Sequence, residues 1–148
     1  MKINLIIFLS KFGVGGAGNS IFRLCKGLAR KKYNISIICL KNCPFDKEFN
    51  KIGIQVYKIK SNKTFFAMSK VLSITKFLIS KKYKKNIFIS NIHYTNVLSL
   101  IFLRNLINLK IILVERTPLM ELSIYFGFID FIKKNIIKSL IYLLYNLS

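Results

Sequence analysis

The chain has 148 residues and a formal net charge of +20, because 25 lysines and arginines face only five aspartates and glutamates. Hydrophobic residues make up 53% of the sequence, which excludes wholesale disorder. Three cysteines are too few, and odd in number, for a disulfide scaffold. We expect residues 1–148 to form one domain whose positive field attracts nucleic acid, anionic lipid or nucleotides.

Targeting and membrane signals are weak in this sequence. The longest stretch without a charge, residues 86–103, carries several polar side chains, whereas a spanning helix needs about 20 mostly apolar residues. The apolar start Met1–Leu9 leads into Lys11 and glycines, without the apolar region or cleavage site of a signal peptide. We therefore predict a cytoplasmic chain with reduced cysteines. These cysteines are Cys25, Cys39 and Cys43.

Apolar runs in chain order predict five strands. They cover residues 3–9, 35–40, 54–59, 87–91 and 111–114. A glycine cluster and a first helix follow the first run, and four apolar residues share one face of that helix: Ile21, Leu24, Cys25 and Leu28. Further helices are expected over residues 64–80, 95–107 and, as one or two helices, 119–147. One face of the last segment carries Ile132, Ile136, Leu140, Leu143 and Leu144.

The order of these elements, β-α-β-β-α-β-α-β-α, predicts the fold class. Strands that alternate with helices are typical of an α/β fold, here a Rossmann-like doubly wound parallel sheet covered on both faces. Ligands of such sheets bind at the carboxyl ends of the strands, beside the point where the strand order reverses. The loops at that edge cover residues 10–19, 41–46, 91–95 and 115–120.

The first of these loops contains the glycine pattern Gly-x-Gly-x-x-Gly over residues 13–18, between a strand and a helix. Glycines let a backbone approach a ligand closely, and the helix amino terminus favours phosphate, so we expect phosphate or pyrophosphate binding here. A dinucleotide fold places an acid at the tip of strand two, where this chain has Leu40-Lys41-Asn42, so NAD is disfavoured. Lys41 leaves NADP open, and the missing Gly-Lys-Ser/Thr excludes a P-loop.

Two polar groups end the later strands. His93 follows strand four, where functional groups project toward a ligand, so we expect it to face a substrate rather than only to support the fold. Glu115 and Arg116 end strand five, either as a surface ion pair or with the arginine holding a phosphate or carboxylate bidentately. No second histidine or thiolate cluster accompanies His93, so no metal is expected.

Lysines gather over residues 63–85 and 133–138. They are predicted to be solvated helix faces, and contact with an anionic membrane surface stays open as the alternative. Several apolar and aromatic residues beside the second group suit a helix lying in a membrane interface: Phe131, Ile132, Ile136, Tyr142 and Tyr145. Nucleic acid is not expected as a partner, because no nucleic-acid-binding motif is present.

Several segments, in order and spacing, resemble the opening of retaining GT-B glycosyltransferases of family 4. They are Ile3–Leu9, Gly13–Ala17, Leu24–Ala29, Ile35–Leu40, Gly53–Tyr57, Ile92–Thr95 and Ile112–Pro118. The resemblance implies the acceptor-side, amino-terminal domain of an enzyme that moves a hexosyl group from a UDP- or GDP-sugar to a surface glycan or polyprenyl-linked acceptor. It also implies no metal or other cofactor, and a location in the cytoplasm, including the inner face of the cell membrane.

The same resemblance implies roles for individual residues. His93 would be the catalytic candidate, in contact with the transferred sugar or the acceptor. The substrate-binding candidates are Gly13, Gly15, Gly16, Asn19, Glu115 and Arg116. Members of the family continue into a second domain that binds most of the nucleotide-sugar, and its Glu-x7-Glu pattern is missing here. We therefore expect this chain alone to be inactive, with a non-catalytic phosphate-binding module or an NADP-type oxidoreductase fragment as the alternatives.

Overall fold

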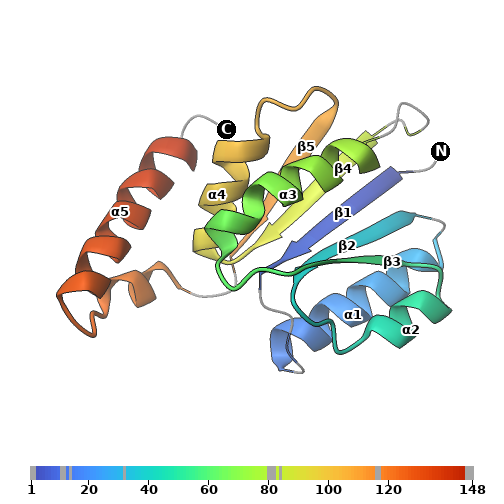
Figure 1. The fold of residues 1–148 in the computed structure, drawn as a ribbon, viewed down its shortest axis with the longest axis horizontal. Coiled ribbons are helices and arrows are strands. Elements are labelled where there is room, and N and C mark those ends of the chain that lie inside the picture. The colour runs from blue at the N-terminus through green and yellow to red at the C-terminus, as the bar shows by residue number, and fades with distance from the viewer. Residues whose placement is uncertain are drawn as a thin grey trace.

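A parallel sheet forms the centre of the computed structural model, which describes residues 3–10, 13, 15–31, 33–79, 83, 85–115 and 118–145. Its strands lie in the order β3-β2-β1-β4-β5 (Figure 1). Their bounds are β1 Ile3–Leu9, β2 Asn34–Leu40, β3 Gln55–Ile59, β4 Lys85–Asn91 and β5 Leu109–Val114. All neighbouring strands pair in parallel. The predicted α/β class and parallel sheet are confirmed.

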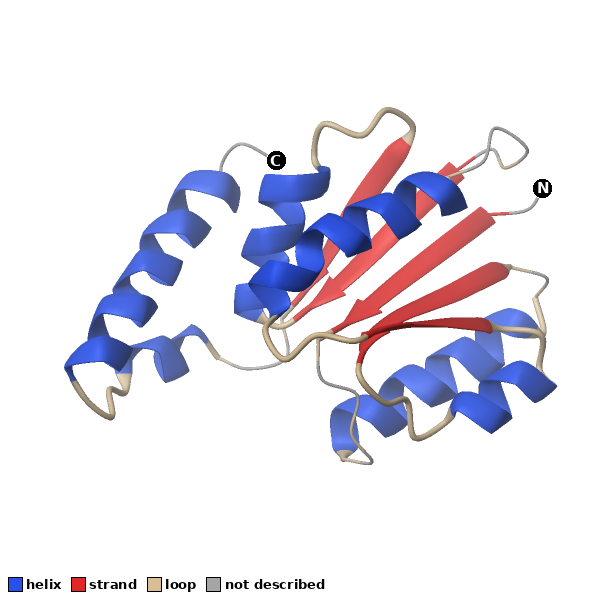
Figure 2. Ribbon diagram, in the orientation of Figure 1, coloured by secondary structure: helices blue, strands red, loops and turns tan. Residues whose placement is uncertain are grey.

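Helices cover both faces of this sheet (Figure 2). One face carries α1 (Gly16–Ala29) and α2 (Asp46–Lys51), and the other carries α3 (Thr64–Leu78) and α4 (His93–Leu103). The short 3-10 helix η1 (Leu119–Ser123) and α5 (Phe128–Tyr145) follow β5, and α5 packs against α4. This arrangement is that of a Rossmann-like doubly wound sheet.

Alternation along the strands divides the core between the two faces. In β1, Leu5 and Ile7 join the cluster under α1 and α2, while Ile6 and Phe8 join the cluster under α3 and α4. All four are buried because β1 lies in the middle of the sheet, where both faces are covered. The near-continuous apolar run that predicted this strand therefore has a direct structural cause.

Some sequence predictions need correction. Helix α2 was not expected, although its acidic first turn and its last-turn Lys51 suit a helix dipole. On α1, Leu24 is 44% exposed and does not share the buried face of Ile21 and Cys25. Helix α4 begins at His93 and ends at Leu103, earlier than the predicted 95–107.

The packed face of α5 also differs from the apolar face picked out in the sequence. Of the predicted face, Leu140 and Leu144 do pack against α4 and η1, beside Ile137 and Ile141. The other three residues are exposed: Ile132, Ile136 and Leu143. Because α5 is apolar on both sides, the sequence pattern alone did not determine which side would be covered.

A buried asparagine ladder crosses the amino-terminal edge of the sheet. Asn4 on β1 is aligned with Asn34 on β2 and Asn86 on β4. The Asn34 amide donates to Asn4 Oδ1 at 2.7 Å, and Asn4 Nδ2 donates to Asn86 Oδ1 and to the Leu78 carbonyl, both at 2.9 Å. Every polar atom of the Asn4 amide is thus bonded, as burial requires.

Two further predictions concern the cysteines and membrane spans. The cysteines are free and buried, and burial raises the pKa of Cys25 to about 12. Within the described part of the chain, none of the helices is long and apolar enough to cross a membrane.

Candidate ligand-binding edge of the sheet

The carboxyl ends of all five strands meet at one edge of the sheet, because the strands are parallel (Figure 1). The chain runs outward from β1 to β2 and β3, then crosses back to β4 and β5. The strand order therefore reverses between β1 and β4, and such a reversal is where doubly wound sheets bind ligands.

The glycine loop between β1 and α1 contains glycines of two kinds. A Cβ atom on Gly15 or Gly16 would meet nothing within 4 Å. A Cβ on Gly18 would lie 1.9 Å from the Gly13 carbonyl oxygen. Gly18 is therefore needed for the loop to pack on the helix, whereas Gly15 and Gly16 leave free space beside the backbone.

The amino terminus of α1 is open to an anion. Gly15 caps it in an extended conformation, with no side-chain hydrogen bond and no acidic residue in the first turn. The first amide groups of a helix carry a partial positive charge and lack partners within the helix. A phosphate beside Gly15 and Gly16 would supply both a negative charge and hydrogen-bond acceptors.

An open pocket of about 370 Å³ adjoins this loop at the ends of β1, β2 and β3. Its lining residues are Ser10, Gly13, Leu40, Lys41, Asn42, Ser61, Asn62 and Thr64. Lys41 supplies a positive charge, in a left-handed backbone conformation with φ of 61°. The amino terminus of α3 opens into the same pocket at Thr64, again without a side-chain cap. These features suit a small polar or anionic ligand.

His93 begins α4 directly after the end of β4. The preceding Ile92 has φ of 77°, which is a strained conformation for a β-branched residue. This turn buries the imidazole, leaving His93 only 4% exposed. Nδ1 contacts the Glu115 carboxylate but lacks hydrogen-bond geometry, and Nε2 has no partner among the described residues.

A polar cluster surrounds the Glu115 carboxylate at the end of β5. Asn96 on α4 donates to Glu115 Oε1 at 2.9 Å and to the Val114 carbonyl at 3.2 Å. The hydroxyl of Tyr145 on α5 also donates to Glu115 Oε1. Burial, and then the hydrogen bond to Glu115, raises the pKa of Tyr145. These contacts fix the carboxylate against the His93 ring.

Thr95 links the start of α4 to the end of β1. Its hydroxyl donates to Ser10 Oγ at 3.0 Å. Ser10 also lines the pocket. This hydrogen bond therefore connects the first turn of α4 to the wall of the pocket, at the point where the strand order reverses.

The structure brings some of the candidate site residues into contact and leaves others apart. His93 contacts Glu115, as their positions at neighbouring strand ends allowed. Gly13 lines the pocket, and Asn19 is exposed on the first turn of α1. Arg116 lies outside the described residues.

Sequence reasoning missed several members of this edge. Asn96 had a detectable signal, since it lies three residues after His93 on the same helix. Tyr145 had none, because thirty residues separate it from Glu115. Within the described ranges, no three His, Cys, Asp or Glu side chains lie close enough to hold a metal ion.

Comparisons with known proteins add no assignment. No family model matches the chain, and no curated protein matches it.

Proposed function

We propose that this chain is the acceptor-side domain of a GT-B glycosyltransferase resembling family 4, which transfers a hexosyl group from a UDP- or GDP-sugar to a surface glycan or lipid-linked acceptor. The observation that carries the proposal is the pairing of an open glycine loop with a buried, partly unsatisfied histidine at one sheet edge. The glycine loop can bind a phosphate group, and the His93 imidazole can form a hydrogen bond with a sugar hydroxyl.

The chemistry would divide between these two parts. The α1 amino terminus would stabilise charge that develops on the leaving diphosphate, which is the electrostatic contribution such transfers need. His93 Nε2, held by the contact of Nδ1 with Glu115, would bond a hydroxyl of the sugar or the acceptor. The neighbouring Asn96 and Tyr145 would keep Glu115 in place.

Thermal shift with UDP- and GDP-sugars tests this proposal. At ten times the dissociation constant, binding should raise the melting temperature by about 2–5 °C. Gly16→Val should abolish the shift, because its side chain would enter the free space beside the loop. Gly27→Val is the matched control, since Gly27 is also exposed with open space around it. An equal shift in the Gly16 variant would refute the loop assignment.

A second candidate, an NADP-type fragment, rests on Lys41 in the pocket at the tip of β2. An NADP-induced thermal shift that Lys41→Gln removes, without any effect of nucleotide-sugars, would favour the NADP-type fragment over the glycosyltransferase.

The glycosyltransferase proposal also predicts that the purified chain alone transfers no sugar, and measurable transfer would contradict that part.

A further inference from the structure

Helix α5 leaves an apolar stripe uncovered on the side that faces away from α4. Among its residues only Ile141 and Leu144 are buried. The exposed stripe comprises Phe128, Ile129, Ile132, Ile136 and Leu143. An exposed apolar surface of this extent is typical of an interaction site.

The stripe continues into an exposed tip, residues 124–129, which consists of the turn after η1 and the first two residues of α5. These six residues carry no charge. Phe126 is 87% exposed and Phe128 is 77% exposed. In Figure 1 the tip lies at the far lower left of the molecule, away from the sheet. Two phenylalanines that are this exposed to solvent contribute little to the packing of this chain.

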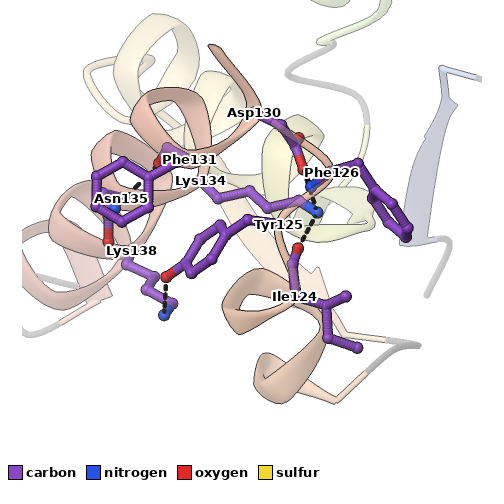
Figure 3. Close-up of polar contacts among 8 residues, drawn as sticks. All are labelled: Ile124, Tyr125, Phe126, Asp130, Phe131, Lys134, Asn135 and Lys138. Carbon is purple, nitrogen blue, oxygen red and sulfur yellow. Dashed lines mark hydrogen bonds and ion pairs between the residues drawn. The ribbon is translucent and has the colours of Figure 1, made fainter. Parts of the chain in front are cut away.

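The tip is held in shape by two lysines of α5 (Figure 3). Lys134 donates to the Ile124 carbonyl at 2.6 Å, pairs with Asp130 at 2.9 Å and lies 5.3 Å from the ring centre of Phe126. Lys138 donates to the Tyr125 hydroxyl at 3.2 Å. The apolar side chains are therefore presented by a pre-organised turn, which lowers the entropic cost of binding.

Positive charge lies behind the tip at a spacing that suits a bilayer. Lys133 is exposed and follows Phe128 by five residues, which is about 7.5 Å along a helix. With α5 entering tip first, apolar side chains at the usual interfacial depth of about 5–10 Å would leave this lysine at the level of the lipid phosphates. The chain's net charge of +20 adds long-range attraction to an anionic surface.

We propose that the tip, residues 124–129, together with Lys133, docks this protein on an anionic lipid bilayer. The inference is independent of the proposed glycosyltransferase activity. It is compatible with a lipid-linked acceptor, because η1 begins five residues after β5 ends at the candidate ligand edge.

Vesicle co-sedimentation of the full 148-residue chain, without any nucleotide-sugar, tests this docking. The chain should sediment with vesicles of phosphatidylglycerol and phosphatidylcholine, and much less with phosphatidylcholine alone. Joint replacement Phe126→Ser and Phe128→Ser should weaken binding by more than about tenfold. Lys133→Gln should weaken it about fivefold.

Phe77→Ser is the matched control, because Phe77 is 79% exposed on α3, away from the tip. It should bind like the parent chain, and thermal melting should show that all variants fold. Equal binding by the tip variant, or equal loss in the Phe77 variant, would overturn the proposal. So would a parent chain that ignores vesicles and forms a dimer which the tip variant dissolves, since the tip would then join two copies of this chain.

Discussion

Two groups of buried polar side chains, one at each edge of the sheet, differ in their hydrogen bonding. At the amino edge, every polar atom of the buried Asn4 amide has a partner in the fold. At the carboxyl edge, His93 Nε2 and Asn96 Oδ1 are buried with no hydrogen-bond partner among the described residues. Both edges belong to the same strands, so the difference does not come from the fold class.

This contrast indicates what each edge is for. Satisfied polar groups hold strand register and stabilise one arrangement of the sheet. Unsatisfied groups cost stability, and functional or strained sites are among the places where proteins retain them. We therefore expect substitutions in the asparagine ladder to lower the free energy of unfolding most, and substitutions at the carboxyl edge to affect ligand binding most.

The largest effect is expected from the asparagine ladder. Asn4→Leu should lower the free energy of unfolding by about 3 kcal/mol, because Asn34, Asn86 and the Leu78 carbonyl each lose a buried partner. Urea denaturation measures this loss. The exposed Asn105→Ala serves as the control and should change stability by less than about 0.5 kcal/mol. Similar values for both would remove the special role of the amino edge.

Two glycines of the loop should respond differently to substitution, because only Gly18 is packed closely. Gly18→Ala should cost about 1–3 kcal/mol, because its Cβ would collide with the Gly13 carbonyl. Gly16→Ala should instead be neutral or stabilise by up to about 1 kcal/mol, since it meets only free space and favours the helix. Thermal unfolding of both variants gives the comparison. A large loss in the Gly16 variant would show that this glycine is structural.

The contact between Tyr145 and Glu115 at the carboxyl edge should make stability depend on pH. The folded state raises the pKa of Tyr145 above its ordinary value of 10.0. A raised folded-state pKa gives stability that is complete below pH 10 and is lost as the pH rises further. Tyr145→Phe should reduce the fall of the melting temperature above pH 10, and Tyr142→Phe, at an exposed position of the same helix, should not. Parallel curves for the two variants would mean that burial and the Glu115 hydrogen bond together do not raise the pKa of Tyr145.

The smallest stability effect is expected at His93. His93→Leu should change the free energy of unfolding by less than about 1 kcal/mol, because it removes an unsatisfied buried group along with one contact to Glu115. The same variant should reduce but not abolish the thermal shift with nucleotide-sugars, because the glycine loop would still hold the diphosphate. A loss of stability as large as that of Asn4→Leu would identify His93 as a structural residue.

Most of the sheet could be predicted from the sequence, because apolar runs and glycine punctuation are local signals. The run 3–9 and the helix after the glycines both appear at the expected places. The contact between His93 and Glu115 could also be expected, because each residue follows the end of a predicted strand and the two strands are neighbours.

Features that depend on distant packing could not be predicted. Tyr145 reaches Glu115 only because α5 folds back on α4. The asparagine ladder required the strand order and register, which place Asn4 between Asn34 and Asn86. Which apolar face of α5 is covered also depended on tertiary contacts, because both faces are apolar.

Nuclear magnetic resonance of the imidazole of His93 is the most direct test of the carboxyl edge as the ligand site. The chain contains one histidine, so its ring signals need no assignment. Titration with UDP- or GDP-sugars should shift these signals to saturation in the parent chain and leave them unchanged in Gly16→Val. Signals that stay fixed with every nucleotide-sugar, while the chain remains folded, would contradict the assignment of the carboxyl edge as the ligand site.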